Sequence, residues 1–162
     1  MNRNLIKIFT GFAAVLMIFL IADTSNAQMR REARGRSVNK AQVKAIINRV
    51  EDRVDNFVRN FDRSLDRSRL NNTNREDLLN KRARDLESAT DDLAREFDRR
   101  EKWAESREEV RKCLDIASDI DRNVRRNRYG RATEANWTRV RFDLNTLADV
   151  YNMAKVGARV YR

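Results

Sequence analysis

The stretch VKAIINRVEDRVDNFVRNFDRSL, residues 43–65, decides the fold. Its apolar residues recur at steps of three and four, which places them along one face of an α-helix, and charged or amide residues occupy the opposite face. A helix with one apolar face has to bury that face against another element. The apolar stripe consists of Ile47, Val50, Val54, Phe57, Phe61 and Leu65, widened by Ile46 and Val58.

Three further helical segments follow with the same kind of stripe. Thr73 and Glu76 form a capping-box pattern that starts the second helix, and Ser106 with Glu109 indicates a break before the third. Gly130 suits the residue that ends the third helix in a left-handed conformation. We therefore expect an all-α protein, an antiparallel four-helix bundle made of two αα-hairpins of which the first is longer.

The unequal hairpins predict an apolar surface at one end of the bundle. If both hairpin turns lie at the same end, the longer hairpin overhangs at the other end. The overhang is then covered either by the C-terminal tail or by a second subunit in a homo-oligomer. The residues expected to form this interaction patch are Ile46, Ile47, Phe97 and Trp103.

The N-terminal region is typical of an export signal. Arg3 and Lys7 precede an apolar run from Ile8 to Ala22, and Ala27 ends a small-residue motif suited to cleavage. The run is shorter than the roughly 20 residues that a membrane-spanning helix needs. We expect residues 1–27 to be a signal peptide that directs the chain to the periplasm or the medium. The alternative is an uncleaved anchor in the inner membrane.

The remaining chain divides into three parts by composition. Residues 28–42 are rich in arginine without an apolar period, so we expect a flexible basic arm. Residues 43–154 form the predicted bundle domain, and residues 155–162 form a C-terminal tail.

The composition argues against most kinds of catalysis. The chain has no Pro, no His, one Cys and four Gly, so it lacks the turn residues of many-stranded β folds and the commonest general base and metal ligand. No carboxylate is expected in an apolar stripe, where burial could tune it for acid catalysis. Cys113, beside the stripe of the third helix, is expected to be a buried thiol, with an intermolecular disulfide as the alternative. We expect no enzyme activity, no cofactor and no metal site.

The positive charge is concentrated in two segments. The formal net charge is +10, yet residues 74–112 are close to neutral. Arginine binds phosphate and carboxylate groups through a planar fork, so concentrated arginines suggest an anionic partner. The candidate anion-binding residues are Arg122, Arg125, Arg126, Arg128 and Arg131 near the third turn, and Arg30, Arg31, Arg34 and Arg36 in the arm.

These features lead to two functional hypotheses. The first is an exported, non-enzymatic bundle that binds or scaffolds anionic envelope components, namely lipid headgroups, lipopolysaccharide or acidic polysaccharide. No sequence-specific nucleic-acid recognition is expected. The second is a periplasmic protein-interaction or chaperone-like bundle that uses the apolar end. A solvated, arginine-rich surface without a ligand is the alternative to both.

Three short motifs resemble those of uncharacterised small secreted bacterial helical proteins. They are RVDNF at 53–57, IDR at 120–122 and DLNTLADVYN at 143–152. The resemblance implies export and an all-helical domain across residues 45–152. It implies no activity and assigns no site residues.

Overall fold

A computed structural model describes residues 38–127 and 129–158 of the chain. The predicted signal peptide, residues 28–37 of the predicted basic arm, Arg128 and the end of the tail lie outside these residues. The arm arginines proposed as anion ligands, Arg30, Arg31, Arg34 and Arg36, therefore lie outside them too.

The described residues are helical, as the sequence predicts. The elements are α2 (Lys40–Asp66), α3 (Asn74–Arg99), the short 3-10 helix η1 (Trp103–Ser106), α4 (Arg107–Arg126) and α5 (Arg131–Val150). None of these helices is long and apolar enough to cross a membrane.

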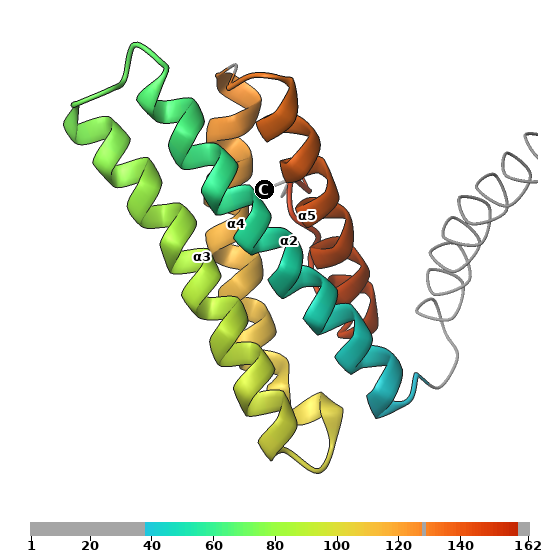
Figure 1. Ribbon diagram of the computed structural model, residues 1–162. Helices are drawn as coiled ribbons and strands as arrows, with labels where there is room; N and C mark the ends of the chain where they lie inside the picture. The colour runs from blue at the N-terminus through green and yellow to red at the C-terminus, as the bar shows by residue number, and fades with distance from the viewer. Residues whose placement is uncertain (1–37, 128, 159–162) are drawn as a thin grey trace, which may run out of the picture. The chain divides into compact units, whose positions relative to one another are not determined.

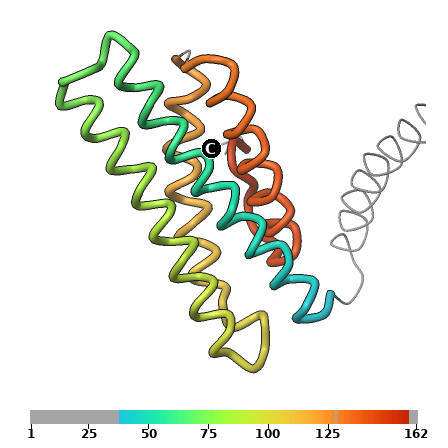
Figure 2. Tube along the Cα trace, in the orientation of Figure 1, coloured from blue at the N-terminus to red at the C-terminus, as the bar shows by residue number. Residues whose placement is uncertain are grey.

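The four long helices run in alternating directions around a shared core (Figure 1). Helix α2 packs against α3 and α5, and α4 packs against the same two neighbours. The α2–α3 and α4–α5 connections lie at the same end, which Figure 2 shows along the chain trace. We call this the loop end of the bundle. The antiparallel arrangement of two hairpins is the one expected from the sequence.

The apolar stripes meet in a core that is rich in aromatic rings. Phe57 stacks on Phe61 with ring centroids 5.1 Å apart, and it also contacts Trp137 at 5.0 Å. Phe61 meets Tyr129 edge-on at 5.0 Å, which joins the core to the loop end. Such ring pairs add about 0.5–1.5 kcal/mol each beyond the area that they bury.

The expected apolar overhang is not present. Ile46, Ile47 and Phe97 are only 1–2% exposed, and Trp103 is half-buried. At that end η1 packs against α3 and α4, so the second hairpin is longer there than the sequence predicted. Trp103 meets the ring of Tyr151 edge-on at 5.2 Å, and its carbonyl accepts a 2.7 Å hydrogen bond from the Tyr151 hydroxyl.

Several helix boundaries differ from the prediction. Helix α2 begins at Lys40, inside the expected arm, because Asn39 and Gln42 form a capping box. Thr73 caps α3 as predicted, whereas Ser106 makes no side-chain cap for α4. Gly130, with φ +90°, precedes α5 and does not end α4, whose C-cap is Asn127.

Candidate functional site

Two aspartates are buried in the bundle, contrary to the expectation that no carboxylate lies in an apolar stripe. Asp143 of α5 is fully buried. Its carboxylate oxygens lie 3.3 Å from Arg49 Nε and 2.6 Å from Arg53 Nη1, both on α2. Burial raises the pKa of Asp143 above its ordinary value, and the two guanidinium groups only partly oppose that shift.

Asp121 of α4 is the second buried aspartate, with 2% exposure. Its Oδ1 accepts hydrogen bonds from Trp137 Nε1 at 3.0 Å and from Arg141 Nη1 at 3.2 Å, both on α5. Arg125 Nη1 lies 3.5 Å from the other oxygen. Asp121 therefore links α4 to α5, while Asp143 links α5 to α2.

The helical period could have identified both aspartates. Asp121 lies four residues after Ala117 and three before Val124, which are both buried. Asp143 similarly lies three residues after the buried Val140 and four before the buried Leu147. Each aspartate thus occupies a position in the apolar stripe of its helix. The sequence prediction placed these side chains in solvent only because they are charged.

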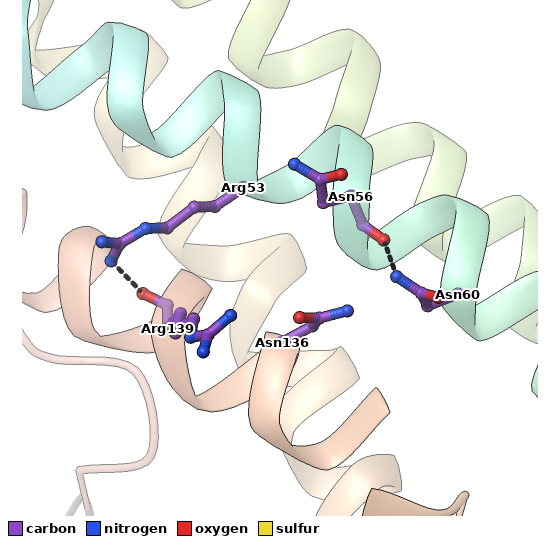
Figure 3. A pocket seen from close by; sticks show the side chains of 5 residues that line it. All are labelled: Arg53, Asn56, Asn60, Asn136 and Arg139. Carbon is purple, nitrogen blue, oxygen red and sulfur yellow. Dashed lines mark hydrogen bonds between the residues drawn. The ribbon is translucent and has the colours of Figure 1, made fainter. Parts of the chain in front are cut away.

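A polar groove runs between α2 and α5, next to the Asp143 ion pairs. It has a volume of about 420 Å³. Figure 3 shows the residues that line it, which are Arg53, Asn56 and Asn60 of α2 and Asn136 and Arg139 of α5. We call it the α2–α5 groove. None of these residues was identified as a site from the sequence, although their spacing of three and four places each set on one helix face.

Internal hydrogen bonds fix one wall of the α2–α5 groove. Arg53 donates to the backbone carbonyl of Arg139 at 3.2 Å while it pairs with Asp143. The side-chain nitrogen of Asn60 donates to the carbonyl of Asn56 at 2.8 Å, as the dashed line in Figure 3 shows. Farther toward the loop end, Ser64 and Thr133 share a 2.6 Å hydrogen bond between α2 and α5.

The segment after α5 lies against α4 and α5 and forms a second groove. The backbone N–H of Val156 donates to Asn145 Oδ1 at 2.8 Å, and Val156 is buried. Gly157 has φ +78° and stands so close to Asp121 that an added Cβ would lie 2.8 Å from its Oδ2. This part of the tail therefore does not cover the expected overhang.

Three of the predicted anion-binding arginines line this second groove, which has a volume of about 460 Å³. We call it the α4–tail groove. Arg122, Arg125 and Arg126 are exposed there, and Lys155 joins them from the tail. The acidic residues that line it are Asp115 and Asp121.

The candidate arginines differ in how far neighbouring acids neutralise them. Arg122 pairs with Asp119, and Arg125 approaches the buried Asp121. Arg126 and Arg131 are exposed and make no ion pair with any residue that the structure describes. Arg131 is the first residue of α5 and does not line the groove. Arg128 lies outside the described residues.

Cys113 is a fully buried thiol on α4, as the preferred interpretation of the sequence had it. Its Sγ contacts the carbonyl of Ala89 on α3 at 3.3 Å. Burial raises the pKa of the thiol to about 12, so the reactive thiolate is scarce at neutral pH. This environment does not suit a nucleophile or an intermolecular disulfide.

A third groove, between α2 and α3, is mainly acidic. Glu51, Asp52 and Asp55 line it together with Asp98, whose carboxylate pairs with Lys44 at 2.5 Å. The pKa of Glu51 is raised by partial burial and then by the neighbouring carboxylates. No group of three or more metal-ligating side chains occurs in the part of the chain that the structure describes.

Comparisons with protein-family models, with curated proteins and with solved structures find no significant match to this chain. Its function therefore has to be inferred from its own residues.

Proposed function

We propose that this protein is an exported, non-enzymatic helical bundle that binds the phosphate groups of anionic envelope lipids through the arginines of α4. The observation that carries the proposal is the α4–tail groove. Four cationic side chains line it, Arg122, Arg125, Arg126 and Lys155. Arg122 pairs with Asp119, Arg125 approaches Asp121 and Lys155 pairs with Asp149 at 2.8 Å, so Arg126 is the cation of the groove that has no acidic partner among the described residues.

The charge balance in the groove favours an external anion. Asp121 is buried and already accepts hydrogen bonds from Trp137 and Arg141. Its charge is therefore shared before Arg125 approaches it. Arg126 has no acidic partner among the described residues, and the side chain of Arg125 is 61% exposed. An exposed guanidinium group without a carboxylate partner, such as that of Arg126, attracts phosphate or carboxylate groups and forms paired hydrogen bonds with them.

Export is the part of the proposal that rests on sequence alone. The basic start, the short apolar run and the small residues before Gln28 support it. In the envelope, the available anions that match the groove are phospholipid headgroups and the phosphates of lipopolysaccharide. The chaperone-like alternative needs an exposed apolar end, and no observation favours it, since Ile46, Ile47 and Phe97 are buried.

The test measures retention of residues 28–162 on vesicles. Vesicles that contain phosphatidylglycerol should retain the protein at low salt, and vesicles of phosphatidylcholine alone should not. Retention should fall steadily as salt is raised, because screening weakens exposed charge interactions. Replacing Arg125, Arg126 and Arg128 by Glu should abolish retention.

The matched control replaces Arg95, Arg99 and Arg111 by Glu. These side chains are 60%, 70% and 54% exposed, and none of them lines the α4–tail groove. The control makes the same change in net charge, so retention of the control but not of the test variant identifies a local site. Equal loss in both variants, or retention that is independent of salt, would contradict the proposal.

A further inference from the structure

We propose that the α2–α5 groove is a separate binding site for a small hydroxylated anion, a sugar acid or a sugar phosphate. In this site Arg139 holds the anionic group, and Asn60 and Asn136 contact the hydroxyl groups. The proposal uses none of the residues that carry the lipid-binding function.

The electrostatics of the groove favour an anion. The lining side chains include two arginines and no carboxylate. Asp143 of α5, whose partner Arg53 lines the groove, is fully buried and is paired with Arg49 and Arg53. The guanidinium of Arg139 is exposed and makes no ion pair within the described residues, so its charge is available to a ligand.

Arg53 serves as a fixed wall of the groove and is not a ligand-binding residue here. Its Nη1 donates a hydrogen bond to the Arg139 carbonyl at 3.2 Å and forms an ion pair with Asp143 Oδ2 at 2.6 Å. These two contacts tie α2 to α5 directly beneath the groove. A groove whose wall is already held in place loses less entropy when a ligand binds.

The amide groups explain why the ligand should carry hydroxyls. Because the nitrogen of Asn60 donates to the carbonyl of Asn56 at 2.8 Å, the Oδ1 of Asn60 is left as an acceptor. The amide of Asn136, half-buried beside Arg139, makes no hydrogen bond with the described residues and offers both donors and an acceptor. Acceptors need a donor from the ligand, which a sugar hydroxyl supplies and a bare carboxylate does not.

The size of the groove agrees with a ligand of this class. Its volume of about 420 Å³ falls within the range of about 300–1,000 Å³ that is usual for small-molecule sites. The lining residues come from both α2 and α5, as Figure 3 shows, so a small ring bound there would contact both helices.

The test is an NMR titration of residues 28–162, which contain every core residue described above. Four probes are compared: glucuronate, glucose 6-phosphate, glucose and inorganic phosphate. Glucuronate, glucose 6-phosphate or both should shift the side-chain amide signals of Asn60 and Asn136, with binding about tenfold or more tighter than that of glucose and inorganic phosphate. Which of the two binds tells whether the anionic group is a carboxylate or a phosphate.

Arg139→Gln should weaken binding of the preferred probe by about tenfold or more, because it removes a charge-assisted contact. The control Arg95→Gln lies on another helix and should leave binding unchanged. Thermal unfolding followed by circular dichroism confirms that both variants fold, as expected for exposed side chains. Binding that Arg139→Gln leaves intact, equal shifts with glucose or inorganic phosphate, or no amide shift with any probe would overturn the proposal.

The two binding proposals can fail separately. Replacing Arg125, Arg126 and Arg128 by Glu should leave this titration unchanged, and Arg139→Gln should leave vesicle retention unchanged. A negative titration together with normal vesicle retention therefore contradicts only the α2–α5 site.

Discussion

At the scale of single residues, the buried aspartates Asp121 and Asp143 make ionic contacts that hold α5 to its two neighbours, α4 and α2. Removing one partner from such a cluster lowers the free energy of unfolding by more than the loss of an exposed ion pair does. The reason is that the remaining buried polar groups have neither water nor a partner. Trp137 is most dependent on this arrangement, since its indole N–H is buried and donates to Asp121.

Asp121→Ala should therefore destabilise the fold by about 2–4 kcal/mol. The variant leaves the Trp137 indole N–H without its acceptor and removes the partner of Arg141. Urea unfolding followed by circular dichroism measures the change. The control is Asp115→Ala on the same helix, an exposed residue that should change stability by less than about 0.5 kcal/mol. Similar losses in the two variants would contradict the role given to Asp121.

Asp143 should give stability a characteristic pH dependence. Its pKa in the folded protein is raised by burial, so the fold favours the protonated carboxyl. The stabilising contribution is therefore complete below the unfolded pKa of about 4 and is lost as pH rises through the raised folded pKa. Asp143→Asn removes this titration.

The measurement is the difference in unfolding free energy between the wild type and Asp143→Asn across a pH series. The stability of the wild type relative to the variant should decline as pH rises. Other carboxyls with raised pKa values, such as Glu51, are present in both proteins and cancel in the difference. A difference that is constant with pH, or that grows in favour of the wild type, contradicts the assignment.

At the scale of elements, the sequence predicted the four long helices and their buried faces, but it predicted only some of the residues at which they begin and end. The three- and four-residue period of α2 identified a face that is buried in the structure. The Thr73 cap was recognisable because its partner lies three residues away. The Asn39 and Gln42 cap was missed, since the arginine-rich composition nearby suggested an arm. Gly130 was placed on the wrong helix because a positive φ is compatible with either end of a loop.

The tail segment offers a test with two glycines. Both have positive φ, but Gly130 has open space where a Cβ would point, whereas a Cβ added at Gly157 would lie 2.8 Å from Asp121 Oδ2. Gly157→Ala should therefore release the tail, because alanine adds a backbone strain of roughly 1–2 kcal/mol at this positive φ and a steric contact with Asp121. Hydrogen exchange at the Val156 N–H should then accelerate about tenfold or more.

Gly130→Ala serves as the control for backbone strain without that contact. It should lower global stability by about 1–3 kcal/mol, because Gly130 starts α5 in a conformation that suits only glycine. Under conditions where both variants are folded, hydrogen exchange at the Val156 N–H should be slower in Gly130→Ala than in Gly157→Ala. Equal exchange rates at Val156 in the two variants would show that Gly157 does not hold the tail.

At the scale of the whole molecule, apolar periodicity predicted the all-helical fold but could not locate the grooves. The α2–α5 groove depends on which helix flanks face each other, and Asn60 and Asn136 are far apart in the sequence. The α4–tail groove depends on the position of the tail, which has no periodicity. The arginines of α4 could be proposed as candidates from the sequence because their local concentration is visible without any tertiary information. The prediction of an exposed apolar end was wrong, since Ile46, Ile47 and Phe97 are buried. That prediction took the second hairpin to be shorter than it is, because it did not include η1.

The placement of the buried carboxylates also bears on the handedness of the bundle. Four antiparallel helices can be arranged clockwise or anticlockwise around a core. In both arrangements α5 packs between α2 and α4, but the side of α5 that faces α2 in one faces α4 in the other. Arg141 and Asp143 are two residues apart, roughly 200° around the helix, so they occupy opposite flanks. Arg141 meets α4 and Asp143 meets α2. In the opposite arrangement Arg141 would face α2 and Asp143 would face α4, so each would lose its partner. The ion pairs of α5 therefore favour one of the two arrangements of the helices.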